Sequence, residues 1–196
     1  MMKPGGPTDM DWRARNRLGL AWITAAVSLG CASVGPVRPV NSRELVVAYD
    51  DARAVDALAF SSNSYESVVR VSLPRGEHQP LRLRYQAKSA GQFEITIYDS
   101  TILETPGDPL EKVSRELAPE DLSDGTDGHW VVEDLAAMKP VKGVIWIGVH
   151  KTAGSPALWT SNVVSGQSFI RNNDPQNPMG LLPTKRTPML RLELAR

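Results

Sequence analysis

The sequence predicts an all-β protein, built as an antiparallel two-sheet β-sandwich of jelly-roll type. Three observations lead to this fold class. Apolar residues recur at every second position after residue 44, which is the periodicity of half-buried strands. All but two of the 15 prolines follow Cys31 and are scattered, which leaves little room for long helices. About ten short strands separated by turn residues are typical of a sandwich or jelly roll.

The N-terminal segment, residues 1–30, is expected to be an export signal and not part of the fold. Arg13, Arg15 and Arg17 precede an apolar stretch that runs from Leu18 to Leu29. A membrane-spanning helix needs about 20 apolar residues, so this stretch is too short to be a stable anchor. A charged region followed by a short apolar region and a small residue is typical of a secretory signal.

The only cysteine of the chain, Cys31, follows this apolar stretch directly. Val27-Ser28-Leu29-Gly30-Cys31 resembles the lipobox of bacterial lipoproteins. The resemblance implies that Cys31 is lipidated and becomes the first residue of the mature chain. Because Ala32 and Ser33 follow the cysteine, it also implies transport to the outer membrane. The alternative is a buried thiol after a plain secretory signal.

Residues 31–43 are expected to be a tether between the lipidated cysteine and the domain. This stretch holds Pro36 and Pro39 among small and polar residues, a composition that suits an extended linker. The β-sandwich domain is then expected to cover residues 44–196.

Charge and cysteine content exclude several classes of function. The 22 basic and 22 acidic side chains sum to zero net charge, which argues against a nucleic-acid partner. A single cysteine forms no intrachain disulfide, no four-thiolate zinc site and no CxxC redox pair.

Alternation and turn residues place the strands in order along the domain. Between the alternating stretches Leu81–Tyr85 and Phe93–Ile97, the residues Ala87–Gly91 are predicted to form a hairpin loop. Val144–Val149 is apolar on both pleat faces and is predicted to be a central strand that buries Trp146. Further strands are predicted at Leu45–Tyr49, Val68–Leu73, Lys112–Leu117, Trp130–Glu133, Leu158–Thr160, Gln167–Ile170 and Met189–Leu194.

The order of these pieces resembles a bacterial extracellular jelly-roll family that occurs in secreted adhesins and beside glycan-binding modules. The matching pieces lie within residues 55–194. They are Ile97-Tyr98-Asp99, the turn Thr105–Asp108, Trp130-Val131, the strand Val144–Val149, and Gly166–Phe169 before the terminal strand. The resemblance implies the fold more than the function.

Two places are candidate ligand sites. Trp159 follows a Gly-Ser-Pro turn, and sugar binding commonly uses an exposed aromatic ring, although a packing role is the alternative. The stretch Arg171–Thr187 is predicted to be a long loop, and loops of this length are often functional. It contains Asn172, Asn173 and Asp174, which are the candidate polar contacts.

The acidic stretch from Glu120 to Gly128 is a candidate calcium site. Asp121, Asp124 and Asp127 supply the carboxylate oxygens that calcium prefers. The stretch lacks the EF-hand spacing, and Asp-Gly is itself turn chemistry, so a solvated turn is the alternative. No other cofactor is expected.

The sequence therefore predicts an outer-membrane lipoprotein that binds and does not catalyse. Its main predicted role is contact with an envelope protein assembly. A carbohydrate-binding, lectin-like surface module is the alternative, and a hydrolase acting on glycans is a further one, because the separation of two catalytic carboxylates is not readable from sequence.

Overall fold

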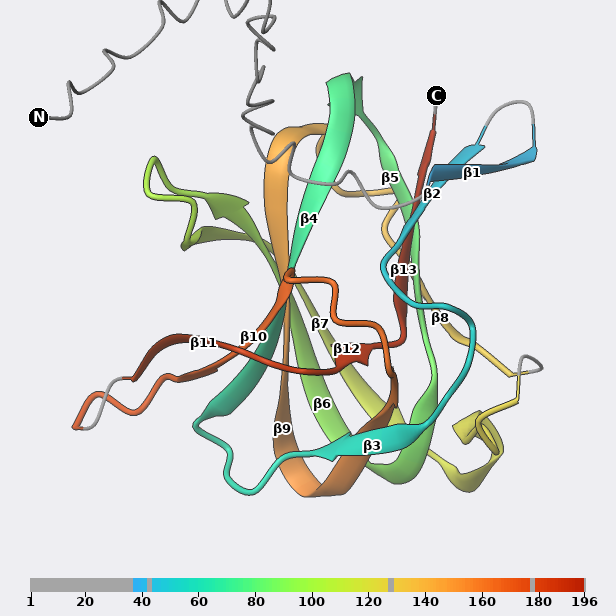
Figure 1. The fold of residues 1–196 in the computed structure, drawn as a ribbon, viewed down its shortest axis with the longest axis vertical. Coiled ribbons are helices and arrows are strands. Elements are labelled where there is room, and N and C mark those ends of the chain that lie inside the picture. Colours follow the sequence, from blue (N-terminus) through green and yellow to red (C-terminus); the bar gives the residue numbers. More distant parts are fainter. Residues whose placement is uncertain (1–36, 42–43, 127–128, 177–178, 196) are drawn as a thin grey trace, which may run out of the picture. The chain divides into compact units, whose positions relative to one another are not determined.

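The computed structural model describes residues 37–41, 44–126, 129–176 and 179–195 (Figure 1). The chain divides into two compact units, Met1–Cys31 and Ala32–Arg196. All described residues belong to the second unit, so the predicted signal and Cys31 lie outside them. In these described ranges, no helix is long and apolar enough to cross a membrane.

Antiparallel strands dominate the described part of the chain, and its one helical element is the short 3-10 helix η2 (Pro119–Asp121). The strands are β1 (Val37–Asn41), β2 (Glu44–Ala48), β3 (Asp56–Ala59), β4 (Tyr65–His78), β5 (Pro80–Tyr85), β6 (Ala87–Ser100), β7 (Pro106–Leu117), β8 (Val131–Asp134), β9 (Val141–Ser161), β10 (Ser168–Asn172), β11 (Met179–Pro183), β12 (Thr187–Pro188) and β13 (Leu190–Ala195).

The strands form two sheets. The smaller sheet has the order β1-β2-β13-β5-β8, and the larger one has the order β11-β10-β4-β9-β6-β7, with β3 and β12 also paired to β9. Eight strands make up the two halves of the fold: β2, β4, β5, β6, β7, β8, β9 and β13. Along the chain, each of these strands lies in the other sheet from the one before it, except that β6 and β7 form a hairpin within the larger sheet. This wrapping of two four-stranded halves is a jelly roll, so the predicted fold class is confirmed.

Apolar side chains from both sheets fill the space between them. Their alternation is the predicted one: the apolar residues of β6 face the core, and the residues between them point away. The principal core residues are Val47, Leu83, Tyr85, Leu192 and Leu194 from the smaller sheet, and Val69, Val71, Phe93, Ile95, Ile97, Ile145, Ile147 and Val149 from the larger sheet. As predicted, Val144–Val149 is central, because β9 pairs with β4 on one side and β6 on the other.

The predicted hairpin loop Ala87–Gly91 is wrong, because these residues begin β6 and the preceding strand β5 lies in the other sheet. The glycine that ends this stretch reflects close packing of strands. Gly91 pairs with Gly154 and has φ +146°, and a Cβ on it would lie 2.6 Å from Cδ of Pro156. A larger residue here would push β6 away from β9.

The predicted loop Arg171–Thr187 is also partly wrong, because β10 extends to Asn172 and β11 pairs with it. Strand β11 is an edge strand, and edge strands tolerate the glycine and proline that indicated a loop. The same reason applies to β1, an edge strand that contains Pro39 and lies inside the stretch predicted as a tether.

Candidate functional site

The face of the larger sheet that points away from the core carries an organised polar cluster. We call this face the outer face. The residues that build the cluster come from three strands and the turn after β10: Glu66 on β4, Tyr98 on β6, Arg171 on β10, and Asn173. Because Val69 and Val71 of β4 face the core, the alternation of the strand directs Glu66 to the opposite side.

Glu66 is the centre of the cluster and is fully buried. Its Oε1 accepts a hydrogen bond from the Tyr98 hydroxyl at 2.8 Å. Its Oε2 accepts hydrogen bonds from Arg171 Nε at 2.6 Å and from Asn173 Nδ2 at 2.8 Å. A buried carboxylate is tolerated only when it is paired and hydrogen-bonded, and both conditions are met here.

Gly148 on β9 leaves the space that Glu66 occupies. A Cβ at this position would lie 2.7 Å from the Glu66 carboxyl carbon and 2.9 Å from Cε2 of Tyr98. No real Cβ approaches heavy atoms that closely. The glycine is therefore a steric requirement of the cluster, although it stands within the most apolar strand of the sequence.

Arg171 is held in a fixed orientation by the cluster. Its guanidinium lies 4.8 Å from the centre of the Tyr98 ring, and its Nε is bound to Glu66. Among the residues that the structure describes, none is hydrogen-bonded to its two terminal nitrogens. A guanidinium with both terminal nitrogens available binds carboxylate or phosphate in a bidentate manner.

Burial and the nearby carboxylate also change the acidity of Tyr98. Burial is the larger cause and the charge of Glu66 the next, and together they raise the pKa of the Tyr98 hydroxyl to about 12. Tyr98 is therefore a neutral hydrogen-bond donor to Glu66 throughout the physiological pH range.

Arg171 lines a groove of about 490 Å³ beside the β10–β11 hairpin. Its lining combines polar and apolar residues. The residues that line the groove are Thr105, Pro106, Arg171, Asn172, Asn173, Asp174, Pro175, Met179, Gly180 and Leu181. Asn172, Asn173 and Asp174, the consecutive residues that the sequence predicted as polar contacts, all line this groove.

These three polar residues also shape the turn that carries them. Asn172 Oδ1 accepts a hydrogen bond from the backbone N–H of Asp174 at 3.0 Å, and Asp174 Oδ1 accepts one from Gln176 N–H at 2.9 Å. Asn173 links the turn to Glu66. The turn and the buried cluster are therefore one polar unit.

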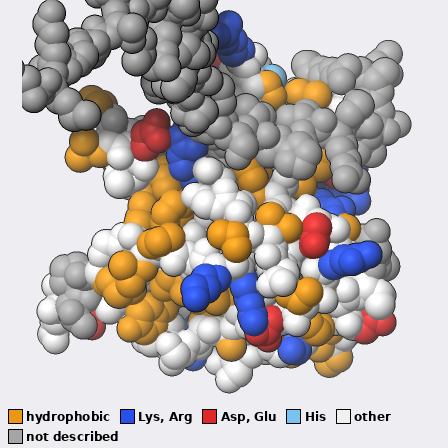
Figure 2. Space-filling view, in the orientation of Figure 1, with side chains coloured by type: hydrophobic (Ala, Val, Ile, Leu, Met, Phe, Trp, Pro, Cys, Tyr) orange, Lys and Arg blue, Asp and Glu red, His pale blue; other side chains and the backbone are white. Residues whose placement is uncertain are grey.

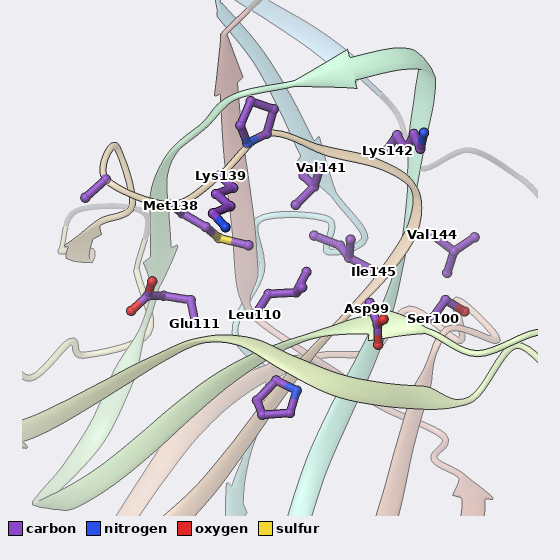
Figure 3. A pocket seen from close by; sticks show the side chains of 13 residues that line it. Asp99, Ser100, Leu110, Glu111, Met138, Lys139, Val141, Lys142, Val144 and Ile145 are labelled. Carbon is purple, nitrogen blue, oxygen red and sulfur yellow. The ribbon is translucent and has the colours of Figure 1, made fainter.

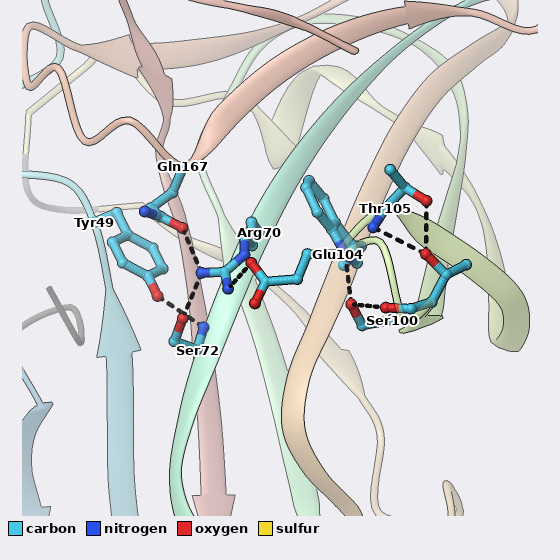
Figure 4. A network of polar contacts seen from close by, with 9 residues as sticks. Tyr49, Arg70, Ser72, Ser100, Glu104, Thr105 and Gln167 are labelled. Atoms are coloured by element: carbon cyan, nitrogen blue, oxygen red, sulfur yellow. Dashed lines mark hydrogen bonds and ion pairs between the residues drawn. The ribbon is translucent and has the colours of Figure 1, made fainter. Parts of the chain in front are cut away.

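A second polar network continues along the outer face (Figure 4). Arg70 Nη2 is bound to Glu104 at 2.7 Å, and its Nη1 donates to Ser72 Oγ and to Gln167 Oε1. Glu104 belongs to the loop between β6 and β7. This network ties the loop to β4.

Trp146 and Trp159 do not supply an exposed aromatic platform. Trp146 is 1% exposed, as predicted, but it lies on the outer face, where its ring centre is 5.6 Å from that of Phe169. Trp159 lies outside the groove; its Nε1 donates to the Ser123 carbonyl at 2.9 Å, and Lys88 Nζ is 4.4 Å from its ring centre.

The described part of the predicted calcium site does not gather carboxylates. Asp121 uses one oxygen for Arg115 and the other for the backbone N–H of Ala118. Asp124 accepts hydrogen bonds from the hydroxyl and N–H of Thr126, which lower its pKa. Asp127 lies outside the described residues, and the described ranges hold no group of three His, Cys, Asp or Glu suited to a metal.

Sequence reasoning missed Glu66, Tyr98, Arg171 and Gly148 as site residues. The only local signal was one charged residue near an end of each of two strands, Glu66 at the start of β4 and Arg171 near the end of β10. These two positions lie opposite each other in the sheet. That pairing depends on the sheet order, which a single sequence does not give.

Fold and site together define a jelly-roll β-sandwich with an arginine-lined groove on its outer face. The chain matches no known protein family and no curated protein. One similar solved structure contains the cysteine protease and lectin-like domains of Cwp84, a surface layer associated protein of Clostridium difficile. The TM-score is 0.48 at 11% identity, over 71% of this chain and 36% of that one. The match thus spans about a third of that chain.

Proposed function

We propose that this protein is a lipid-anchored binding module of the bacterial envelope whose groove holds a carboxylate-bearing polysaccharide. The observation that carries the proposal is the fixed guanidinium of Arg171 at the groove wall. The module binds its ligand and performs no chemistry on it.

The arrangement of Arg171 supports an anionic ligand. Glu66 occupies only Nε, and the Tyr98 ring supports the guanidinium from one side. The side chain is already ordered before binding, so less conformational entropy is lost when the ligand arrives. Two parallel N–H···O bonds to a carboxylate are the expected contact.

The rest of the groove supports a sugar as the carrier of that carboxylate. The lining includes the amide, carboxyl and hydroxyl groups of Asn172, Asn173, Asp174 and Thr105, and Met179 and Leu181 add apolar surface. Sugar rings present hydroxyls at their edges and apolar C–H groups on their faces. In this groove, charge and hydrogen bonds replace the aromatic stacking that many sugar sites use.

A hydrolase is a weaker interpretation of the same groove. Glycoside hydrolysis requires two carboxyl groups that flank the bond to be cleaved. Asp174 is the one carboxylate side chain among the described lining residues. Glu66 has hydrogen bonds on both oxygens and is fully buried, so it is unsuited to act as a base.

Contact with an envelope protein is the second candidate function. It is favoured by apolar surface on the β10–β11 hairpin, where Leu182 is 51% exposed. Figure 2 shows hydrophobic side chains gathered over this hairpin. The anchor and the outer-membrane location are part of both proposals and rest on Cys31.

Isothermal titration calorimetry of the full-length chain with oligogalacturonate tests the proposed function at the level of residues. Arg171→Lys keeps the charge and loses the planar fork, and it should weaken binding at least tenfold. Gly180→Phe should also abolish binding, because open space surrounds Gly180 and the ring would fill the groove without disturbing Glu66. Arg186→Lys, outside the groove, is the matched control and should bind normally.

The proposal is contradicted if Arg171→Lys and Gly180→Phe bind as well as Arg186→Lys does. Thermal unfolding of each variant shows whether a loss of binding reflects a loss of folding. Gly180→Phe is the decisive variant for this purpose, since it changes no hydrogen bond of the cluster.

A further inference from the structure

The hairpin between β6 and β7 projects from the sandwich (Figure 1). Its tip carries two exposed apolar residues. Ile102 is 101% exposed and Leu103 is 84% exposed. Two adjacent aliphatic side chains in water at a loop tip gain nothing for the stability of the fold. Such residues commonly mark a contact with another molecule.

The tip is held rigidly. The N–H of Thr101 donates to the Thr105 carbonyl, and the N–H of Glu104 donates to the Thr101 carbonyl, each at 2.9 Å. The hydroxyls of Thr101 and Thr105 are 2.8 Å apart. Glu104 adopts φ +53° and is bound to Arg70, which fixes the tip on the sheet (Figure 4). A contact made by an ordered tip loses little conformational entropy.

The second feature is an apolar pocket of about 760 Å³ at the same end of the larger sheet. The pocket exists because the sheet is split here. The pairing of β6 with β9 stops at Tyr98, which lies opposite Trp146. The earlier residues of β9, back to Val141, pair with β4. Figure 3 shows Leu110, Met138, Val141 and Ile145 around a common space. The pocket reaches the hydrophobic core, because the last three belong to it.

Charged side chains stand at both features. Asp108, which is exposed, follows the tip, and Glu104 at the tip is paired with Arg70. The pocket is lined by Lys139 and Lys142 together with Asp99 and Glu111, and exposed Lys139 offers a charge opposite to that of Asp108. The pocket falls within the size range of sites that accept small ligands, so two aliphatic side chains fit.

We infer that Ile102 and Leu103 of one copy insert into this pocket of a second copy. Ile102 and Leu103 are not among the residues that line the pocket of their own chain. The hairpin that carries the tip also forms one side of the pocket, through Ser100 and Pro109, so a two-fold dimer fills both pockets with the same contact. This inference is independent of the Arg171 groove.

Disulfide cross-linking in membranes tests the inference with the full-length chain. Two differently tagged copies are co-expressed, one with Ile102→Cys and the other with Val144→Cys, a residue that lines the pocket. Oxidation of the isolated membranes should give a cross-linked heterodimer. The control pairs Val144→Cys with Leu182→Cys, another exposed apolar position, and keeps Cys31 unchanged in both experiments.

The cross-link between the first pair should exceed that of the control pair at least fivefold, and adding Leu103→Asp to the Ile102→Cys copy should remove the excess. Equal cross-linking of the two pairs, or no effect of Leu103→Asp, would overturn the inference. Uptake of octanoate that Val144→Trp blocks, without the heterodimer, would also overturn it and assign the pocket to a small apolar ligand.

Discussion

At the scale of single residues, the outer face depends on one buried charge and on the glycine opposite it. Glu66 orients Arg171 through Nε, and the two share the same polar unit as Tyr98 and Asn173. Removing one partner of a buried ion pair leaves an uncompensated charge, which is more costly than removing both. The anion binding that we propose for Arg171 is thus coupled to the stability of the sheet.

Replacing Gly148 with alanine should destabilise the protein by roughly 2–4 kcal/mol, because the new Cβ displaces Glu66 and breaks its hydrogen bonds. Urea denaturation measures this change in the free energy of unfolding. Gly180→Ala is the matched control and should be nearly neutral, since nothing lies within 4 Å of a Cβ at that position. Equal stability of the two variants would refute this role of Gly148.

The raised pKa of Tyr98 predicts a loss of stability in alkali. In the unfolded chain a tyrosine ionises near pH 10, whereas in the folded protein Tyr98 ionises near 12. The folded state therefore binds more protons in this range. The contribution of the protonated Tyr98 hydroxyl to the free energy of unfolding is complete below pH 10 and is lost as pH rises to about 12. Ultraviolet titration should show a tyrosine with pKa of about 12 that is missing in Tyr98→Phe. An unchanged titration curve in the variant would contradict the assignment.

At the scale of elements, the sequence allowed prediction of strands but not of their partners. The central strand within β9, the terminal strand β13 and the burial of Trp146 were readable, because alternation and apolar runs are local signals. The path from β5 to β6 was not readable, because Gly91 is small for the sake of a strand that lies far along the sequence. The site was missed for the same reason, since it joins three strands and a turn.

Strand β4 offers an element-scale test, because its pairing with β10 stops at Val69, which lies opposite Ser168, the first residue of β10. Beyond this point, the N–H of Ser72 donates to the Tyr49 hydroxyl at 2.9 Å. Tyr49→Phe should cost about 1–2 kcal/mol, since it leaves that N–H unsatisfied. Hydrogen exchange should show faster exchange of the Ser72 amide, and Tyr65→Phe should leave it unchanged. Equal exchange of the Ser72 amide in the two variants would argue against this role of the Tyr49 hydroxyl.

At the scale of the whole molecule, the described residues form a compact sandwich with two separate features at its surface, the arginine-lined groove and the β6–β7 tip. Groove and tip both lie outside the core that the two sheets share, although the buried Glu66 that orients Arg171 also contributes to the stability of the larger sheet. A protein that keeps such features in addition to its core is suited to binding. The anchor predicted from the sequence would hold it at a membrane surface.

Metabolic labelling with a fatty-acid probe tests that anchor. The natural chain should incorporate the probe and fractionate with outer membranes, and Cys31→Ala should lose both properties because it lacks the sulfur that carries the lipid. Ser33→Ala, two residues after Cys31, is the control and should be labelled normally. An unlabelled natural chain in the soluble fraction would show that the prediction for Cys31 is wrong.

The most direct test of the central claim compares two polymers with the same sugar backbone, one with charged carboxylates and one with neutral methyl esters. The unaltered full-length protein is titrated with oligogalacturonate and with its fully methyl-esterified form, at low and at physiological salt. The acidic form should bind at least tenfold more tightly, and its affinity should fall as salt screens the contact with Arg171. Equal affinity for the two forms, or affinity for neither, would contradict the claim that this groove recognises a carboxylate-bearing polysaccharide.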